Sequence, residues 1–290
     1  MRLRPNARIL IRCPDQPGIV AAVSGFLAHW QANILTSQQH STDPEGGYFF
    51  MRMVFDAGAI EEADRQRFEA AFAREVATPF AMDYSINWPG PGPRMAIMVS
   101  KADHALLELL WRWRNGELLG SVELVVSNHE KARDVTQSFG VPFHCLPVTP
   151  DTKTEQETEL SRLLASAEVD LLILARYMQV LSPAFVQRWH GRVVNIHHSF
   201  LPAFVGADPY RQAYERGVKL IGATAHFVTD ELDAGPIIAQ DVRPVSHREG
   251  VPALKRLGRE LERSVLARAV EAVLDDAVMV HENRTVVFDR

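Results

Sequence analysis

The chain has 290 residues, which at roughly 100–200 residues per domain indicates about two compact domains. Hydrophobic residues make up 47% and charged residues 23%, as in ordinary folded proteins, which excludes disordered and collagen-like chains. The net charge of −5, from 31 Lys and Arg against 36 Asp and Glu, provides no basic field for a polyphosphate backbone, so we expect no nucleic acid partner.

The first 88 residues alternate between strand-like and helix-like patterns. We predict strands over 8–12, 33–40, 48–56 and 82–87, and helices over 18–30 and 61–76. Apolar residues in both helices recur every three or four positions, which predicts an apolar stripe against a sheet. In the first helix these are Val20, Val23, Leu27 and Trp30. The βαββαβ order is ferredoxin-like.

A segment rich in proline and glycine, WPGPGP at 88–93, follows the last of these strands. Neither a helix nor a ladder of strand hydrogen bonds can run through three prolines. We therefore assign residues 1–88 to a first domain, 89–93 to a linker and 94–290 to a second domain.

Short apolar runs and helical patterns alternate in the second domain. We predict strands over 95–99, 124–126, 171–174 and 193–196, and helices over 106–113, 132–139, 184–189 and 251–274. Such alternation is typical of an α/β fold with an open, mostly parallel sheet flanked by helices.

Three sites carry helix-start signals. Thr154 with Glu157 and Ser246 with Glu249 have the spacing of a capping box, and Ser182 precedes a proline.

Several kinds of site are excluded by inspection. Cys13 and Cys145 are too far apart in the sequence for a C-x-x-C site, and we expect no disulfide framework and no metal. The motifs G-x-G-x-x-G, G-x-x-x-x-G-K-[ST], H-E-x-x-H and G-x-S-x-G are absent. The chain shows no secretory pattern at its start and no apolar stretch of about 18 residues, so we expect a cytoplasmic protein without membrane association.

One dense polar segment, NIHHSFLP at 195–202, follows a predicted parallel strand. Because strand side chains alternate, Asn195 and His197 should share one face, at the edge where open α/β sheets bind ligands. An amide can donate to the oxygen of a carbonyl group under attack, and an imidazole can move a proton at neutral pH. A carboxylate from the acidic loop at 229–236, for which we select Asp233, would orient His197 and hold the attacking water.

These residues resemble the formyltetrahydrofolate-dependent formyl transfer family, in which an Asn-x-His motif and a later Asp form the catalytic trio. The resemblance covers most of residues 94–280. The segments NIHHSFLPAF at 195–204, GADPYRQAY at 206–214 and GATAH at 222–226 resemble its deformylase branch, in which water accepts the formyl group. The resemblance implies a Rossmann-like formyltransferase fold for the second domain.

It also implies hydrolysis of 10-formyltetrahydrofolate to tetrahydrofolate and formate, which balances the one-carbon folate pool and supplies formate for purine synthesis. No tightly bound cofactor is implied, and the folate is the substrate. In this scheme Asn195 donates to the formyl oxygen, His197 relays a proton to the leaving nitrogen, and Asp233 orients His197 and the water.

Further residues take roles from the same resemblance. The pterin is expected against Arg176, Met178, Gln179 and Val180 and against the acidic loop at Asp230. Arg176 has surface pairing as its alternative role.

His198 stands where amine-formylating relatives have proline, so we expect it to select water as the acceptor.

The segment DQPGI at 15–19, at the first strand-to-helix turn, is similar to the ACT domain. An ACT domain implies pairing between chains, hence a homo-oligomer, and often an amino-acid effector at the interface. A plain dimerisation scaffold without a ligand is the alternative.

Two other functions are compatible with the same residues and remain as alternatives to hydrolysis. One is formyl transfer to a small amine, and the other is a catalytically silent sensor of folate or amino acids. The loop SKADH at 100–104 contains no Gly-rich phosphate cradle, and the chain shows no basic barrel domain for tRNA after residue 280.

Overall fold

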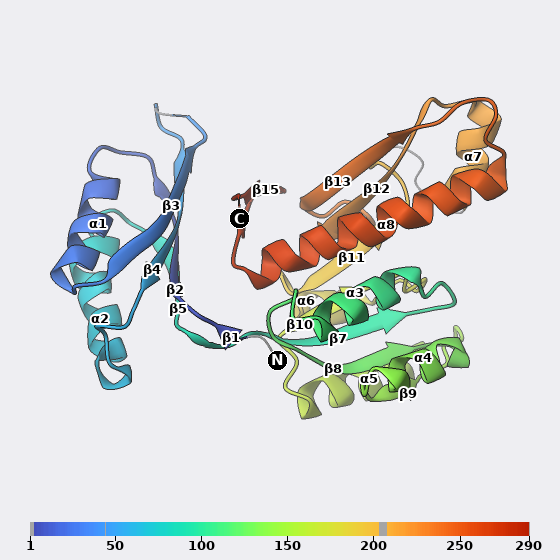
Figure 1. The fold of residues 1–290 in the computed structure, drawn as a ribbon, viewed down its shortest axis with the longest axis horizontal. Coiled ribbons are helices and arrows are strands. Elements are labelled where there is room, and N and C mark those ends of the chain that lie inside the picture. The colour runs from blue at the N-terminus through green and yellow to red at the C-terminus, as the bar shows by residue number, and fades with distance from the viewer. Residues whose placement is uncertain (1–2, 44, 203–207, 290) are drawn as a thin grey trace. The chain divides into compact units, whose positions relative to one another are not determined.

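The structure is a computed structural model that describes residues 3–43, 45–202 and 208–289. The chain forms two compact units, which are described separately. The first contains residues 3–91, 276–281 and 286–289, and the second contains residues 92–275 and 282–285 (Figure 1). The prediction from sequence placed residues 276–281 in the second domain, whereas they pack with the N-terminal unit: Arg4 forms an ion pair with Asp276 at 2.8 Å.

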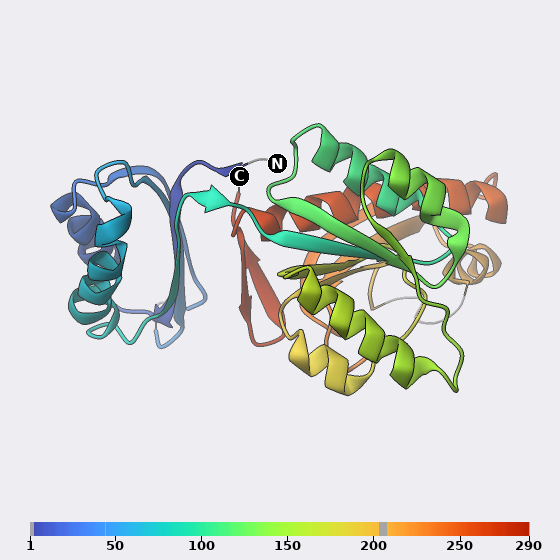
Figure 2. The ribbon, with the colours of Figure 1, turned by 90° about the horizontal axis from the view of Figure 1, so that it is seen from below.

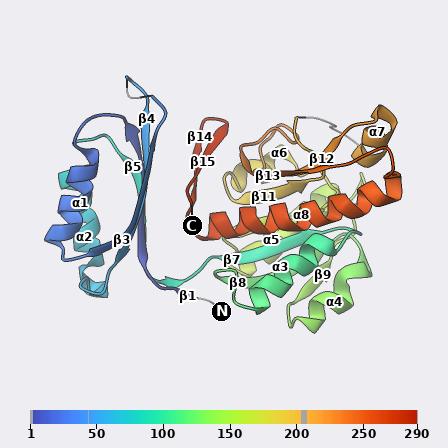
Figure 3. The same cartoon turned by 45° about the horizontal axis from the view of Figure 1, so that its top comes forward.

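The N-terminal unit is an antiparallel sheet with helices on one face (Figure 3). Its elements are β1 (Leu3–Arg4), β2 (Ala7–Pro14), α1 (Ile19–His29), β3 (Asn33–Ser41), β4 (Tyr48–Asp56), η1 (Glu62–Asp64), α2 (Arg65–Phe72), η2 (Ala73–Ala77), β5 (Asp83–Asn87) and β6 (Gly90–Pro91). The strand order β3-β4-β2-β5 confirms the predicted ferredoxin-like architecture.

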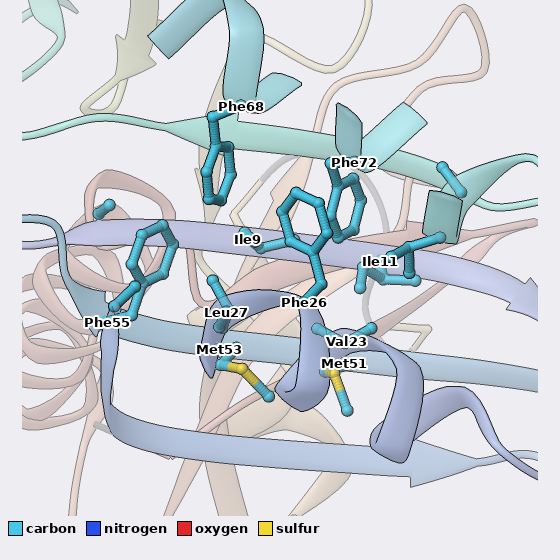
Figure 4. Close-up of a cluster of buried hydrophobic side chains, with 14 of the residues drawn as sticks. Ile9, Ile11, Val23, Phe26, Leu27, Met51, Met53, Phe55, Phe68 and Phe72 are labelled. Atoms are coloured by element: carbon cyan, nitrogen blue, oxygen red, sulfur yellow. The ribbon is translucent and has the colours of Figure 1, made fainter. Parts of the chain in front are cut away.

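Aromatic side chains from both helices form the centre of this unit (Figure 4). The ring of Phe26 lies 5.0 Å from that of Phe68 and 5.3 Å from that of Phe72, both edge-on, an arrangement that aromatic pairs prefer. Val20, predicted to lie on the apolar stripe, is 39% exposed, and Phe26 takes its place in the core.

The second unit contains a seven-stranded sheet. Its elements are β7 (Arg94–Val99), α3 (His104–Arg114), β8 (Ser121–Ser127), η3 (Glu130–Ala132), α4 (Arg133–Ser138), β9 (Phe143–Cys145), α5 (Lys153–Ser166), β10 (Leu171–Leu174), α6 (Pro183–Arg188), β11 (Val193–His197), α7 (Pro209–Arg216), β12 (Leu220–Phe227), β13 (Ile237–Pro244) and α8 (Val251–Leu274). The final hairpin, β14 (Val278–His281) and β15 (Arg284–Val287), has residues in both units.

The order of this sheet is β13-β12-β11-β10-β7-β8-β9, with antiparallel pairing only where β12 and β13 join it. Helices cover both faces: α3 and α8 lie on one, and α5 and α6 on the other (Figure 2). The chain passes from β7 toward β8 in one direction and from β10 toward β11 in the other, so the order reverses between β7 and β10. Ligands of open α/β sheets bind outside the strand ends at such a reversal.

The helix-start predictions have mixed outcomes. Ser182 caps α6 by accepting a hydrogen bond from a backbone N–H, as predicted. The box at Thr154 is wrong, because α5 already begins one residue earlier and the Glu157 carboxylate instead accepts the backbone N–H of Ser182. Ser246 does donate to Glu249, but this turn precedes α8 without capping it.

Within the described residues, no helix is both long enough and apolar enough to cross a lipid bilayer.

Candidate active site

The end of β11 carries two polar side chains on one face of the sheet. In the antiparallel pairing with β12, Asn195 lies opposite His226 and His197 lies opposite Thr224. Because directly opposed residues point to the same side, Asn195, His197 and His226 share a face. This is also the face of Val193, which packs in the cluster that includes Leu160 of α5.

The loop between β12 and β13 brings a carboxylate onto this face. The Nδ1 atom of His197 lies 3.1 Å from Oδ2 of Asp233. Asp233 has a φ of 55°, in the left-handed region that Asp tolerates better than most residues. A Cβ at Gly235 would lie 1.8 Å from the carbonyl oxygen of Phe227, so this loop packs against the end of β12 only with glycine at that position.

The ionisation of Asp233 is set by competing effects. Burial alone raises the pKa of this carboxyl, but the hydrogen bond and charge of His197 hold the pKa well below its usual range. Asp233 is therefore a carboxylate throughout the physiological range, able to accept from His197 and to fix the orientation of its ring.

His226 is the functional residue that sequence reasoning missed. Its Nδ1 lies 2.8 Å from the carbonyl oxygen of Phe227, which only accepts, so Nδ1 carries the proton. In the neutral ring, Nε2 then accepts a hydrogen bond from the side-chain amide of Asn195 at 3.1 Å. His226 thus fixes which way the Asn195 amide faces and leaves its second N–H for a ligand.

No local sequence pattern could have revealed this contact, because 31 positions separate the two residues in the chain. It depends on the register of β11 against β12.

The other nitrogen of His197 has no partner among the residues that the structure describes. His197 is 5% exposed, and among the described residues its buried Nε2 makes no hydrogen bond. Buried polar atoms in folded proteins nearly always have a partner, and an unsatisfied one in a polar cluster indicates a ligand atom. The imidazole is therefore held by Asp233 at one nitrogen and able to exchange a proton at the other.

The segment expected to contact a pterin lies beside this cluster at the sheet edge. The hydroxyl of Ser100, at the end of β7, accepts the backbone N–H of Met178 and anchors the segment. Met178 and Val180 expose 55% and 59% of their surface, and Gln179 is half-buried. Exposed apolar side chains on an anchored backbone suit a flat aromatic ligand.

The acidic loop, which is also expected to contact the pterin, has an exposed residue as well. Asp230 is exposed and accepts a hydrogen bond from Gln187 at 3.5 Å. The structure thus leaves Asp230 accessible at the edge of the loop that carries Asp233.

Arg176 has a different environment from the one expected. Its side chain is only 15% exposed and its Nε lies 3.4 Å from Oε2 of Glu262. The guanidinium is directed at helix α8, and the backbone carbonyl of Arg176 accepts the N–H of Ser100. Any contact of Arg176 with a pterin would therefore use its backbone.

His198 is buried on the side of the strand end that faces α7 and α8. Its ring lies 5.1 Å from that of His197 and 6.1 Å from that of Tyr210. Burial and the nearby charge of Arg176 lower the pKa of His198 to about 3, so it is a neutral imidazole at physiological pH. It lines a pocket of about 30 Å³ with Tyr210, room for one or two water molecules.

Residues 203–207, which include parts of two segments of the predicted resemblance, lie outside the described residues. No group of three or more His, Cys, Asp and Glu side chains suited to a metal ion occurs in the described ranges.

An oriented amide, two imidazoles and a carboxylate at the end of an α/β sheet are suited to chemistry at a carbonyl carbon. Comparison with known proteins specifies the family. The Formyl transferase model matches residues 93–270, and the ACT domain model matches residues 7–71. The chain therefore belongs to the formyl transferase family and carries an N-terminal ACT domain, as the sequence resemblance implied.

Individual relatives match over nearly the whole chain. A formyltetrahydrofolate deformylase of Bacillus subtilis (strain 168) is 52% identical over 98% of this chain and 94% of that protein. A crystal structure of a formyltetrahydrofolate deformylase from Pseudomonas syringae pv. tomato has a TM-score of 0.93 at 46% identity, covering 98% of this chain and 94% of that one. A glycinamide ribonucleotide transformylase from Symbiobacterium toebii covers only 68% of this chain and 95% of its own, with a TM-score of 0.64 and 30% identity.

Proposed function

We propose that this protein is a hydrolase that converts 10-formyltetrahydrofolate and water to tetrahydrofolate and formate. One observation carries the proposal: the pairs Asn195–His226 and His197–Asp233 meet on one face at the end of β11, in a chain that resembles formyltetrahydrofolate deformylases along nearly its full length. Hydrolysis of the formyl group serves one-carbon metabolism and releases formate for purine synthesis.

The chemistry follows from the roles of the four side chains. Water attacks the formyl carbon, a C–O bond forms, and the carbonyl oxygen gains negative charge. The free N–H of Asn195 donates to that oxygen, an interaction worth about 2.7–4 kcal/mol in the transition state. The C–N10 bond then breaks, and N10 takes the proton that His197 transfers through Nε2.

Asp233 assists this proton transfer by orienting His197. Its Oδ2 accepts from Nδ1 of His197, which aims Nε2 away from the loop, and its Oδ1 lies 3.7 Å from Nε2 of His226. The carboxylate stabilises the imidazolium that forms when His197 takes the proton of the attacking water.

His198 selects water as the acceptor. It is neutral and buried, and it lines a pocket of about 30 Å³ with room for a water molecule. A neutral imidazole can accept a hydrogen bond from water and so hold the nucleophile.

The folate is held mainly by backbone groups of the segment that Ser100 anchors. The exposed side chains of Met178 and Val180, the half-buried Gln179 and the rim residue Asp230 complete the surface for the pterin. No tightly bound cofactor takes part.

The ACT domain pairs with the same domain of another chain, and an amino acid at that interface regulates the enzyme. What supports this proposal is the ACT match over residues 7–71 and the segment 15–19 at its first strand-to-helix turn. We assign residues 1–88 to this regulatory unit, 89–93 to the linker and 94–290 to the catalytic unit, except that residues 276–281 and 286–289 group with the regulatory unit.

The test is an assay of purified protein with 10-formyltetrahydrofolate in the presence and absence of glycinamide. We expect formate and tetrahydrofolate in equal amounts, unchanged by the amine. N-formylglycinamide in place of formate would identify a formyltransferase, and folate binding without turnover would identify a sensor; either result overturns the proposal.

A further inference from the structure

Glu262 of α8 is a buried carboxylate with three polar partners from three different elements. It is 1% exposed. Its Oε2 lies 2.7 Å from Nε2 of His104, at the start of α3, and 3.4 Å from Nε of Arg176, after β10. Its Oε1 accepts the hydroxyl of Tyr210 in α7 at 2.6 Å. None of these contacts belongs to the cluster of Asn195, and the family resemblance gave Glu262 no role.

The contact between Tyr210 and Glu262 is built into the sequence of α8. Gly258 lies one helical turn before Glu262, on the same face. A Cβ at position 258 would lie 2.0 Å from the hydroxyl oxygen of Tyr210. Glycine in the interior of a helix lowers its stability by roughly 0.5–1 kcal/mol relative to alanine. At position 258, however, glycine leaves the space that the Tyr210 hydroxyl occupies.

The partners of Glu262 are also the surroundings of His198. The ring of Tyr210 lies 6.1 Å from that of His198, and both residues line the pocket of about 30 Å³. The positive charge of Arg176 also lowers the pKa of His198, and the negative charge of Glu262 opposes this shift. Glu262 thus accepts a hydrogen bond from the tyrosine beside His198 and forms an ion pair with Arg176.

A buried ion requires such partners to remain charged. Burial raises the pKa of the Glu262 carboxyl, but the hydrogen bond from His104 and the charge of Arg176 hold the pKa below its usual value. The carboxylate therefore stays ionised and keeps both Tyr210 and Arg176 in place.

We propose that Glu262 is a positioning residue for the acceptor side of the reaction: through Tyr210 and Arg176 it fixes His198 and the size of the adjacent pocket, and so favours water over amines as the nucleophile. This inference rests on the proposed hydrolysis and deepens it. Glu262 itself touches no reacting atom.

The test compares four proteins: wild type, Glu262→Gln, Tyr210→Phe and the control Glu260→Gln. Glu260 lies on the same helix, where it is half-exposed and paired at the surface with Arg243. Each protein is assayed with 10-formyltetrahydrofolate plus glycinamide, and formate and N-formylglycinamide are both quantified. The kcat and KM for the folate are measured in parallel, and folding is checked by circular dichroism.

For Glu262→Gln and Tyr210→Phe we expect kcat for hydrolysis to fall about tenfold with little change in KM, because displacement of a positioned group by a fraction of an ångström is enough for such a loss. N-formylglycinamide, which we do not expect from wild type, should form alongside formate in these two variants, whereas Glu260→Gln should match wild type.

A purely structural role would lower the amount of active protein and leave formate as the only product of the formyl group. Formate without N-formylglycinamide in Tyr210→Phe, which removes only a hydroxyl and should fold, overturns the inference even if Glu262→Gln does not fold. Absence of formate with the wild-type protein would instead contradict the proposed function itself.

Discussion

Asn195 and His226 form a pair in which one side chain sets the direction of the other. The backbone oxygen of Phe227 fixes the proton on Nδ1 of His226, and Nε2 then fixes the amide of Asn195. An amide that is free to turn would present its oxygen to the formyl oxygen for part of the time, and the two acceptors would repel each other.

This coupling leads to a prediction about non-additive variants. Asn195→Ala should reduce kcat about 10²–10³-fold with folding intact, since it removes the donor to the oxyanion. His226→Ala should reduce kcat about tenfold, because the donor remains but is no longer oriented. The double variant should be no slower than Asn195→Ala alone, as measured by formate release. Losses that multiply would show that the two side chains act independently.

A second prediction concerns His198 and the pH dependence of the protein's stability. In the unfolded chain its pKa is 6.5, whereas in the folded protein it is lowered to about 3. Between these values the unfolded state binds one more proton than the folded state, so stability falls as the pH is lowered through this window. The loss from this group is about 1.4 kcal/mol per pH unit.

The check is hydrogen–deuterium exchange of the β11 and β12 amides between pH 6 and pH 4, in wild type and in His198→Asn. The free energy of opening should fall more steeply in wild type. Equal slopes would mean that His198 is protonated in the folded protein.

The site residues that could be predicted from the sequence are those that a local sequence pattern marks. Asn195 and His197 share a face because strand side chains alternate, and Asp233 stands in an acidic loop. His226 and Glu262 could not be found in this way, because their partners are distant in the sequence and are brought together by strand register and helix packing. Arg176 lies in the segment expected to contact the pterin, but only the structure shows that its side chain is directed at Glu262.

The loop between β12 and β13 is the element on which the site depends most. It carries Asp233 to His197, and it closes against β12 through Gly235. The backbone N–H of Phe227 donates to the carbonyl of Pro236 at 2.9 Å, which ties the two ends of the loop together.

Gly235→Ala should therefore displace this loop while the sheet remains intact. The added methyl group would overlap the Phe227 carbonyl, and overpacking of this kind costs about 1–3 kcal/mol. We expect kcat for formate release to fall about 100-fold through misplacement of Asp233. Gly250→Ala is the matched control, since only Pro252 at 3.8 Å would meet its Cβ. Full activity in Gly235→Ala would show that the position of Asp233 is not critical.

Elements with strong periodicity were predictable, and their boundaries were less so. The βαββαβ order and the last helix, Val251–Leu274, match the prediction. The capping box at Thr154 failed because a nearby cap, Ser182, uses Glu157 as its partner, a tertiary contact that no local pattern contains.

As a whole, the molecule consists of two units, each with its own core. In the N-terminal unit the core is rich in aromatic residues, with the ring of Phe26 in contact with those of Phe68 and Phe72. The assignment of residues 276–281 to this unit could not be predicted from sequence, because a short segment that follows a long helix carries no signal of which core it joins.

Separate cores predict separate unfolding. Phe68→Ala, which empties a fully buried site, should cost the N-terminal unit about 3–5 kcal/mol. Exchange protection should fall in β2, β4 and β5 and remain unchanged in β7, β10 and β11, as measured by hydrogen–deuterium exchange. Equal loss of protection in both sets would show that the chain unfolds as one cooperative unit.

The most direct measurement follows the acceptor oxygen itself. When wild-type protein turns over 10-formyltetrahydrofolate in H₂¹⁸O, mass spectrometry of the products should show formate with one solvent oxygen for every tetrahydrofolate released, and Asn195→Ala should form this labelled product about 10²–10³ times more slowly. Formate without ¹⁸O, or tetrahydrofolate released without formate, would contradict attack of water on the formyl carbon held by Asn195, His197 and Asp233.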